Sequence, residues 1–282
     1  MTLDLLSIDV GSGAIAAVTR RYGGVSEAPF DSLNMSFRFD QYGHMTRQDM
    51  VRNQEQVMNN RVLVADALGM QVDRWVVGKL VHGSDVAVVT EAHAGRGARS
   101  FEMGLPAVDA LVTDVSDLPL VVLVADCAPV LFHDPVRRAI GVAHAGYRGA
   151  IDGVAANTVA AMVENYGCNP ANIRVVVGPC LGPQSLEMQN AEIVAEAVSA
   201  HGPSASLTGP AGTPHLDVPE MVRSQVMATG VPKPNIDLTD IDVAGGQEFF
   251  SFRSAEHLHY DETDPTKVSR PTGRFAAIVT LL

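Results

Sequence analysis

The sequence predicts an α/β (α+β) protein: a single-domain sandwich of mixed β-sheets with helices on the outer faces. Short apolar runs rich in β-branched residues alternate with helix-like stretches through the middle of the chain, as in α/β proteins. The first and last thirds instead contain hairpin-like pairs of apolar runs, which are typical of antiparallel strands. The length of 282 residues allows one large domain or two small ones. The chain after the best linker candidate, 202–214, is too short to form a core of its own, so we expect residues 1–282 to form a single domain.

The first part of the chain predicts a hairpin, a helix and two strands. Glycines at the centre of residues 5–19 indicate a turn between two apolar stretches. Apolar residues spaced three or four apart, with a glycine after them, indicate a helix over 48–68. Strands are expected at 74–81 and 85–90, followed by a polar, glycine-rich loop over 91–104.

The centre is the most apolar part of the chain and is expected to hold its buried strands. Near-continuous β-branched runs of this length suit strands that are covered on both faces. The predicted strands are 119–126, 129–134, 139–146 and 172–179, with a final strand at 275–282. Helices are predicted at 150–165, 190–200 and 218–228, and the Pro/Gly-rich stretch 202–214 is predicted to be a surface loop of the same domain.

Composition and charge exclude several classes of protein. The chain has 20 Lys and Arg against 32 Asp and Glu, a formal net charge of −12, so no nucleic-acid-binding surface is expected. Three cysteines cannot form a disulfide framework and indicate a reducing compartment. The N-terminal residues lack a signal-peptide pattern, and no apolar run reaches the roughly 18 residues of a membrane span. We therefore predict a cytoplasmic protein without membrane or nucleic-acid partners; the composition indicates no particular oligomeric state.

Three candidate metal ligands stand where apolar runs end. His82, Cys127 and His144 each follow such a run, beside a turn that contains glycine or proline. Side chains at strand ends converge on one edge of an open sheet, which is the usual place for a site. Two imidazoles and a thiolate are a suitable ligand set for zinc. The alternative is that the cysteine is a small core residue and the histidines are only hydrogen-bonded; the spacing in the sequence does not decide between the two.

The number of ligands bears on the kind of metal site. Structural zinc is held by four protein ligands, whereas catalytic zinc usually has three and keeps one position open. Cys168, at a predicted helix end, and Cys180, in a turn, do not end strands of the same kind. If metal is bound, an open site that activates water is therefore favoured.

Other segments offer polar groups for a substrate. Arg148, flanked by glycines at a predicted helix start, combines a guanidinium with a helix N-terminus and suits a phosphate. Asp126 either orients a ligand or acts as an acid or base, or it is a solvated or capping carboxylate. The roles of Cys180 and Glu187, near a rigid Gly-Pro turn, stay open. His93 lies in a similar His-Ala-Gly stretch but is interpreted as a loop residue without a metal role.

Ten short segments, in order along the chain, resemble the laccase-domain family, also called the multicopper polyphenol oxidase or purine nucleoside phosphorylase family. They are Arg21–Ser26 (RYGGVS), Ser32–Asn34 (SLN), Asn60–Arg61 (NR), Val81–Gly83 (VHG), Asp109–Thr113 (DALVT), Ala125–Val130 (ADCAPV), Ala143–Gly149 (AHAGYRG), Gly178–Pro183 (GPCLGP), Phe249–Arg253 (FFSFR) and Thr272–Ala276 (TGRFA). Each segment alone is weakly specific, but the ordered set, from about residue 18 to the last residue, is strongly so.

The resemblance implies a zinc enzyme with a mixed α/β sandwich in one domain. In the family, the metal is held by the histidine of V-H-G, the cysteine of A-D-C and the histidine of A-H-A-G, which fall on His82, Cys127 and His144. Members are described as acting on purine nucleosides, by phosphorolysis of the glycosidic bond and by deamination of adenosine. An older description, copper-dependent oxidation of phenols, also belongs to the family.

Several positions depart from the family pattern, but none is an expected metal ligand. Leu80 replaces the usual glutamine before V-H-G, and Tyr147 replaces the usual tryptophan after A-H-A-G. Arg38 stands where a histidine is usual, and Asp40-Gln41 replaces a glycine–aspartate step. The stretch 240–248 lacks the cysteines that often precede the F-F-S-Y-R segment. These changes bear on substrate preference more than on catalysis.

Together, the sequence predicts a zinc-dependent enzyme that uses a purine nucleoside and phosphate. The predicted catalytic residues are His82, Cys127, His144 and Arg148, of which the first three hold the metal. Arg148 is expected to bind phosphate, with Arg61 or Arg21 beside it. The predicted contacts to substrate are Asn34, Arg61, Asp109 and Tyr147.

Two rival functions come from other classes. A copper-type polyphenol oxidase would need many histidines in paired H-x-H spacing, but among the nine histidines the one such pair is His257-Leu258-His259. The second rival is a non-catalytic protein in which zinc is structural.

Overall fold

The structure, a computed structural model, describes residues 3–39, 45–209, 211–245, 247–255, 259–260, 268–269 and 271–282. Asp40, Gln41, His257 and Leu258, which figure in the sequence analysis, lie outside this part of the chain. The described α-helices are α1 (Arg47–Leu68), α2 (Tyr147–Ile151), α3 (Val154–Tyr166), α4 (Ala191–His201) and α5 (Val218–Ala228). None of the helices in the described ranges combines the length and the apolar character needed to cross a bilayer.

Two large sheets form the centre of the molecule. One has the strand order β1 (Leu5–Ser7), β2 (Ala14–Thr19), β15 (Phe275–Leu281), β6 (Leu120–Val124), β3 (Val76–Val77). The other has the order β12 (Ile236–Leu238), β9 (Arg174–Val177), β7 (Ala128–Asp134), β8 (Ala139–Ala145), β5 (Ala110–Thr113), β4 (Val86–Val88). Each sheet mixes antiparallel pairs with parallel ones, which are β3–β6, β4–β5 and β9–β12. Two smaller antiparallel pairs are formed by β10 (Ser206–Thr208) with β11 (Pro214–Leu216) and by β13 (His259–Tyr260) with β14 (Val268–Ser269).

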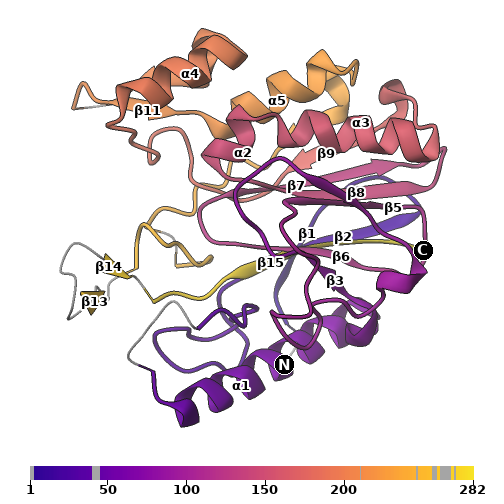
Figure 1. The fold of residues 1–282 in the computed structure, drawn as a ribbon, viewed down its shortest axis with the longest axis vertical. Helices are drawn as coiled ribbons and strands as arrows, with labels where there is room; N and C mark the ends of the chain where they lie inside the picture. The colour runs from indigo at the N-terminus through magenta and orange to yellow at the C-terminus, as the bar shows by residue number, and fades with distance from the viewer. Residues whose placement is uncertain are drawn as a thin grey trace.

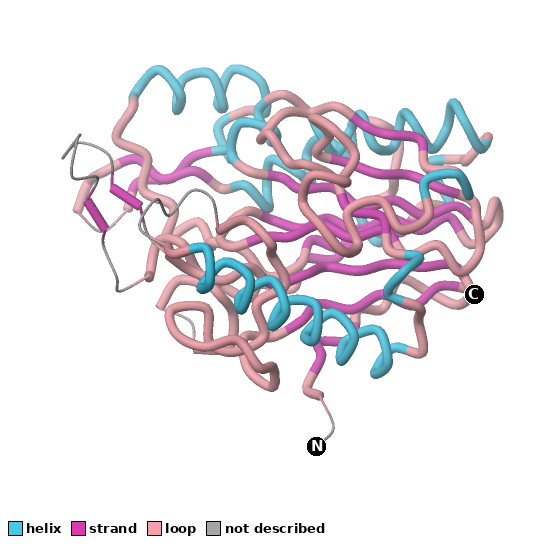
Figure 2. The backbone as a smooth tube through the Cα atoms, turned by 60° about the horizontal axis from the view of Figure 1, so that its bottom comes forward, coloured by secondary structure: helices cyan, strands magenta, loops and turns pink. Residues whose placement is uncertain are grey.

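The two sheets pack face to face, and helices cover both outer faces (Figure 1). Helix α1 lies against the five-stranded sheet, and α2 to α5 lie on the side of the six-stranded sheet, as the second view also shows (Figure 2). The alternation along β15 produces this layering: Ala277 and Val279 pack between the sheets, whereas Ala276 and Ile278 pack toward α1. The predicted sandwich of mixed sheets with outer helices is confirmed.

The apolar runs of the sequence are explained by this four-layer arrangement. In β8, Ile140 and Val142 belong to the core between the sheets, while Ala143 and Ala145 belong to the core beneath α2, α3 and α5. Both faces of the strand are therefore buried, although its neighbours β5 and β7 are antiparallel to it. Alternation of polar and apolar residues would leave polar groups in one of the two cores.

Three predicted elements differ from the structure. The expected helix 150–165 starts at Tyr147 and breaks into α2 and α3, because Gly153 adopts a left-handed φ of 84° between them. The expected strand 74–81 is reduced to β3, because the chain leaves the sheet after Val77 and Gly78 instead bridges to Leu105. The stretch 202–214 is not purely loop, since it contains β10 and starts β11.

Candidate metal centre

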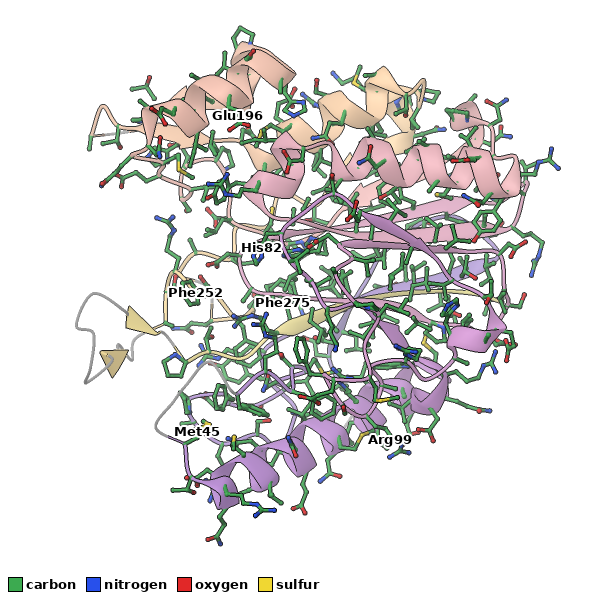
Figure 3. All side chains as sticks on the ribbon, viewed as in Figure 1. Met45, His82, Arg99, Glu196, Phe252 and Phe275 are labelled. Carbon is green, nitrogen blue, oxygen red and sulfur yellow. The ribbon has the colours of Figure 1, made fainter. Side chains whose placement is uncertain are left out.

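The structure brings His82, Cys127 and His144 together. One ligand atom from each residue lies within 4.8 Å of the others. The two imidazole rings are 4.9 Å apart, with an angle of 80° between their planes. His144 is buried, whereas His82 is exposed, so the group is open on one side. Figure 3 shows His82 at the end of the two sheets at which Phe252 also lies.

Strand register explains the meeting of Cys127 and His144. The β7–β8 pairing sets Pro129 opposite His144, so Cys127, just before β7, lies beside Gly146, just after β8. The β5–β8 pairing sets Ala110 opposite Ala143, and therefore places Asp109 beside His144. A candidate metal ligand, His144, and the carboxylate that hydrogen-bonds to it are thus both fixed by the six-stranded sheet.

Asp109 positions both histidines. Its carboxylate accepts a hydrogen bond from Nδ1 of His144 (2.8 Å), which leaves Nε2 as the nitrogen available to a metal. It also accepts the backbone N–H groups of Val81 (3.2 Å), His82 (3.0 Å) and Gly83 (2.8 Å). These bonds hold His82 in a left-handed turn with φ 63°. The sequence suggested that His82 follows the end of a strand. In the structure it lies instead in a turn that Asp109 holds in place.

Gly146 gives the three side chains the space that they occupy. A Cβ at this position would lie 3.0 Å from Cδ2 of His82, 3.2 Å from Sγ of Cys127 and 3.8 Å from Cε1 of His144. Its φ of −70° is open to any residue, so steric contact alone favours glycine there. The ligand group therefore packs directly against the backbone at the start of α2.

The electrostatics of the group favour the ligand form of Cys127. Burial raises the pKa of this thiol, but charge and hydrogen bonds from His144 and His82 outweigh that effect and lower the pKa to about 6. Burial lowers the pKa of His144, and the neighbouring Cys127 and Asp109 raise it to about 9. One thiolate and two imidazoles, with one imidazole fixed by a carboxylate, are a donor set that fits zinc.

A cavity of about 900 Å³ adjoins the ligand group. Its wall includes all three candidate ligands. Apolar and aromatic side chains form much of the remainder, among them Phe37, Val77, Leu80, Phe101, Leu123, Tyr147, Leu181, Leu186, Met188 and Phe252. The charged side chains on the described wall, apart from the histidines, are Arg38, Arg61, Arg253, Arg274 and Asp126. Four guanidiniums against one carboxylate, in a chain of net charge −12, make this cavity suited to an anion.

Two of the predicted substrate contacts, Tyr147 and Arg61, lie on this wall. Tyr147 is partly buried at the start of α2. Arg61 is buried on α1, and its guanidinium donates to the carbonyls of Met35, Gly97 and Ala98 at 2.7–3.0 Å. Burial lowers the pKa of Arg61 to about 9. Its donors therefore brace two wall segments, and little of its hydrogen-bonding capacity remains for a ligand.

The other predicted polar contacts, Asn34, Asp109, Arg148 and Arg21, are not on the cavity wall. The Asn34 side chain is buried and bonds to the backbone of Ser36 and Arg274. Arg148 is exposed, with its guanidinium 5.3 Å from the centre of the Tyr147 ring. Arg21 bonds to Asp31. Arg148, the glycine-flanked arginine that the sequence suggested for phosphate, therefore does not line the cavity.

The arginines that do face the cavity were missed by reasoning from single residues. Arg253 and Arg274 lie in the FFSFR and TGRFA segments, so the signal was present in two of the ten quoted segments. Both arginines interact electrostatically with Asp126. Burial raises the pKa of Asp126, although a hydrogen bond from Ser251 opposes the shift. Asp126 therefore belongs to the cavity wall and is not a solvated surface carboxylate.

The remaining candidates stay outside the ligand group. Cys180 is buried, and its backbone pairs with that of Asp242 in an isolated β-bridge. Burial raises the pKa of its thiol well above that of an ordinary cysteine. Glu187 pairs with His215 through the backbone and does not line the cavity. Nδ1 of His93 accepts the backbone N–H of Thr90, three residues earlier, in its own turn.

Fold and site together define a mixed α/β protein in which two histidines and a cysteine, placed as a metal could use them, adjoin a large, arginine-lined cavity. The family model described as multi-copper polyphenol oxidoreductase laccase matches residues 15–282. The chain belongs to this laccase-domain family, as its ordered segments suggested.

Similar proteins carry the name purine nucleoside phosphorylase. A Streptomyces coelicolor protein of that name is 36% identical over 274 residues, which cover 97% of this chain and 98% of the relative. Purine nucleoside phosphorylase YlmD of Geobacillus stearothermophilus is 34% identical over 233 residues, 81% of this chain and 80% of the relative.

Solved structures have the same fold. The crystal structure of Bacillus licheniformis hypothetical protein YfiH aligns with a TM-score of 0.84 at 30% identity and covers 99% of this chain and 96% of that one. The YlmD crystal structure from Geobacillus stearothermophilus aligns with a TM-score of 0.82 at 30% identity, covering 96% and 92% of the two chains.

Proposed function

We propose that this protein is a zinc-dependent purine nucleoside phosphorylase that also deaminates adenosine. The observation that carries the proposal is the His82–Cys127–His144 group on the wall of a cavity that also presents several guanidiniums. The names of the relatives support the nucleoside and phosphate as substrates. The three free cysteines fit a cytoplasmic location.

The cavity wall suits the two substrates differently. Tyr147 and the apolar residues around Leu80 offer a surface on which a purine ring would stack and lose water. Arg253 and Arg274 would hold phosphate, because guanidiniums bind phosphate oxygens with two parallel N–H groups. We assign phosphate to these two arginines in place of Arg148.

Phosphorolysis needs phosphate and ribose to be held face to face. A phosphate oxygen forms a bond to C1′, the C1′–N9 bond breaks, and the purine leaves with the electron pair and takes a proton. In deamination, water adds at C6 of adenosine and ammonia leaves, which gives inosine. Zinc held by His82, Cys127 and His144 would supply Lewis-acid chemistry when bound. Asp109 would keep His144 in the tautomer that binds metal.

Copper oxidase chemistry is the second candidate, because two histidines and a cysteine also suit copper and the family description names it. A multicopper enzyme needs several metal sites. Among the described residues, one group of three or more His, Cys, Asp or Glu is placed for a metal, and it has three members. A three-member group fits an open zinc site better than either a multicopper centre or a closed structural site.

Metal content and product analysis test the proposal together. The purified protein is analysed for metals and then incubated with adenosine or inosine, with and without phosphate. We expect one zinc per chain, free purine and ribose 1-phosphate only when phosphate is present, and inosine from adenosine. Oxygen uptake with a phenol and a copper-loaded protein would favour the oxidase instead, and a zinc-loaded protein that converts no nucleoside refutes the proposal.

Cysteine variants provide matched controls. Cys127→Ala removes a ligand and is expected to lose zinc and turnover together. Cys168→Ala removes a buried thiol outside the group and is expected to retain both. Full activity in Cys127→Ala would show that the metal site is assigned wrongly.

A further inference from the structure

We propose that Asp126 is a positioning residue that fixes the phosphate-binding Arg253 relative to the metal ligand Cys127. The inference rests on the proposed function, since it takes phosphate as the ligand of Arg253. Asp126 directly precedes Cys127 in the chain and lies on the same cavity wall.

The carboxylate of Asp126 ties down the segment that carries Arg253. Its Oδ1 accepts the hydroxyl of Ser251 (2.6 Å), and its Oδ2 accepts the backbone N–H of Arg253 (2.8 Å). The Ser251 hydroxyl in turn accepts the backbone N–H of Ser254 (3.1 Å). A residue more than a hundred positions earlier in the chain therefore sets the path of the backbone from Ser251 to Ser254.

The backbone of Asp126 is itself fixed. Its φ is 85°, in the left-handed region that a non-glycine residue rarely adopts. Its carbonyl accepts the N–H of Leu181 (2.8 Å), another residue of the cavity wall. The turn thus joins three pieces of the wall, which carry Cys127, Leu181 and Arg253. A strained turn that persists in such a position is typical of a functional site.

Charge argues for the same role. Asp126 is the one carboxylate on the described cavity wall, and a bare carboxylate there would repel phosphate. Both of its oxygens instead accept hydrogen bonds, and Arg253 and Arg274 act electrostatically on it. The aspartate therefore orders the arginine segment while its own charge is compensated.

Asp126→Asn tests the tether with little change in size. An asparagine amide has one acceptor oxygen in place of two and carries no charge, so it cannot accept the Ser251 hydroxyl and the Arg253 N–H together, and whichever bond it keeps is no longer charge-assisted. Asp242→Asn is the matched control, because Asp242 also accepts a serine hydroxyl (Ser185, 2.5 Å) and a backbone N–H (Ala244, 2.9 Å) but does not line the cavity.

Three measurements follow on the zinc-loaded proteins. We expect Asp126→Asn to weaken binding of inorganic phosphate, measured by calorimetry, at least tenfold and to raise the KM for phosphate similarly, with a smaller change in kcat. Zinc content is expected to stay at the wild-type value. Amide hydrogen exchange at Arg253 is expected to accelerate. Asp242→Asn should leave phosphate affinity within about twofold of wild type.

The outcomes separate this inference from the proposed function. Unchanged phosphate affinity in Asp126→Asn, or loss of zinc from that variant, overturns the positioning role, as does a wild-type protein that binds no phosphate. Absence of nucleoside turnover, with phosphate binding weakened as expected, overturns the proposed function and leaves the tether supported. If Asp126→Asn does not fold, Ser251→Ala removes one of the two bonds without changing the Asp126–Cys127 turn, and a loss of phosphate affinity is again expected.

Discussion

Gly146 offers a sharp test of the metal centre, because a single methyl group there would press on the ligands. In Gly146→Ala, the new Cβ would lie 3.0 Å from His82 Cδ2 and 3.2 Å from Cys127 Sγ, so these side chains must move by several tenths of an ångström. Metal–ligand distances tolerate only about 0.2 Å. Disturbing groups that orient metal ligands costs about 10–100-fold in affinity, so we expect zinc to bind at least about tenfold more weakly, or ~1.4 kcal/mol.

Gly83→Ala is the matched control for this substitution. Gly83 is adjacent to His82, but a Cβ there would meet Asp109 Oδ2 at 3.6 Å and Val81 Cγ2 at 3.7 Å, which are ordinary contacts. Zinc affinity in this variant should stay within about twofold of wild type. Competition titration with a coloured chelator measures both affinities, and thermal unfolding checks that both variants are folded. Wild-type zinc affinity in folded Gly146→Ala would refute the reasoning, as would an equal loss in Gly83→Ala.

Three further predictions concern groups around the site. Arg61→Leu would leave the carbonyls of Met35, Gly97 and Ala98 without their buried donor, so we expect a loss of about 3 kcal/mol in the free energy of unfolding by urea. Arg52→Leu, at an exposed position of the same helix, should lose less than about 1 kcal/mol, and equal losses in the two variants would contradict the bracing role of Arg61. Asp109→Asn should weaken zinc binding about 10–100-fold, since its amide nitrogen cannot accept N–H groups, and an unchanged zinc affinity would argue against the positioning of His144 by this carboxylate. In metal-free protein, the rate of alkylation of Cys127 should increase with pH through a midpoint near its pKa of about 6 and then level off, because only the thiolate reacts. Cys168 is buried and has its pKa raised to about 12, so it should stay unlabelled in the folded chain. Mass spectrometry of the labelled peptides measures both rates, and a midpoint for Cys127 near that of a free thiol would count against the influence of the histidines.

The meeting of the three candidate ligands could be predicted from the sequence because their residue types are chemically distinctive. His82, Cys127 and His144 are the residues at which apolar runs stop, and the structure assembles them. The carboxylate that positions them could not be identified in this way. Asp109 precedes β5, which the apolar pattern did not single out, and its contact with His144 depends on the register between β5 and β8.

The arginines show the opposite problem. Every arginine has the same chemistry in a sequence, so proximity to a helix start made Arg148 the candidate for phosphate. In the structure, Arg148 lies at the surface, and most hydrogen-bond donors of Arg61 are used by backbone carbonyls. Arg253 and Arg274 line the cavity instead. These outcomes depend on contacts between segments far apart in the chain, such as the bond from Arg253 to Asp126, which no local pattern contains.

The central place of β15 in its sheet has a consequence for biosynthesis. This strand, residues 275–281, pairs with β2 on one side and with β6 on the other, yet it is the last described element to leave the ribosome. Until it emerges, β2 and β6 have open edges, and the apolar faces that they share with β15 are uncovered, a state that favours aggregation. Cys127 follows β6 by only a few residues, so the group of His82, Cys127 and His144 is expected to become stable only after synthesis of this strand.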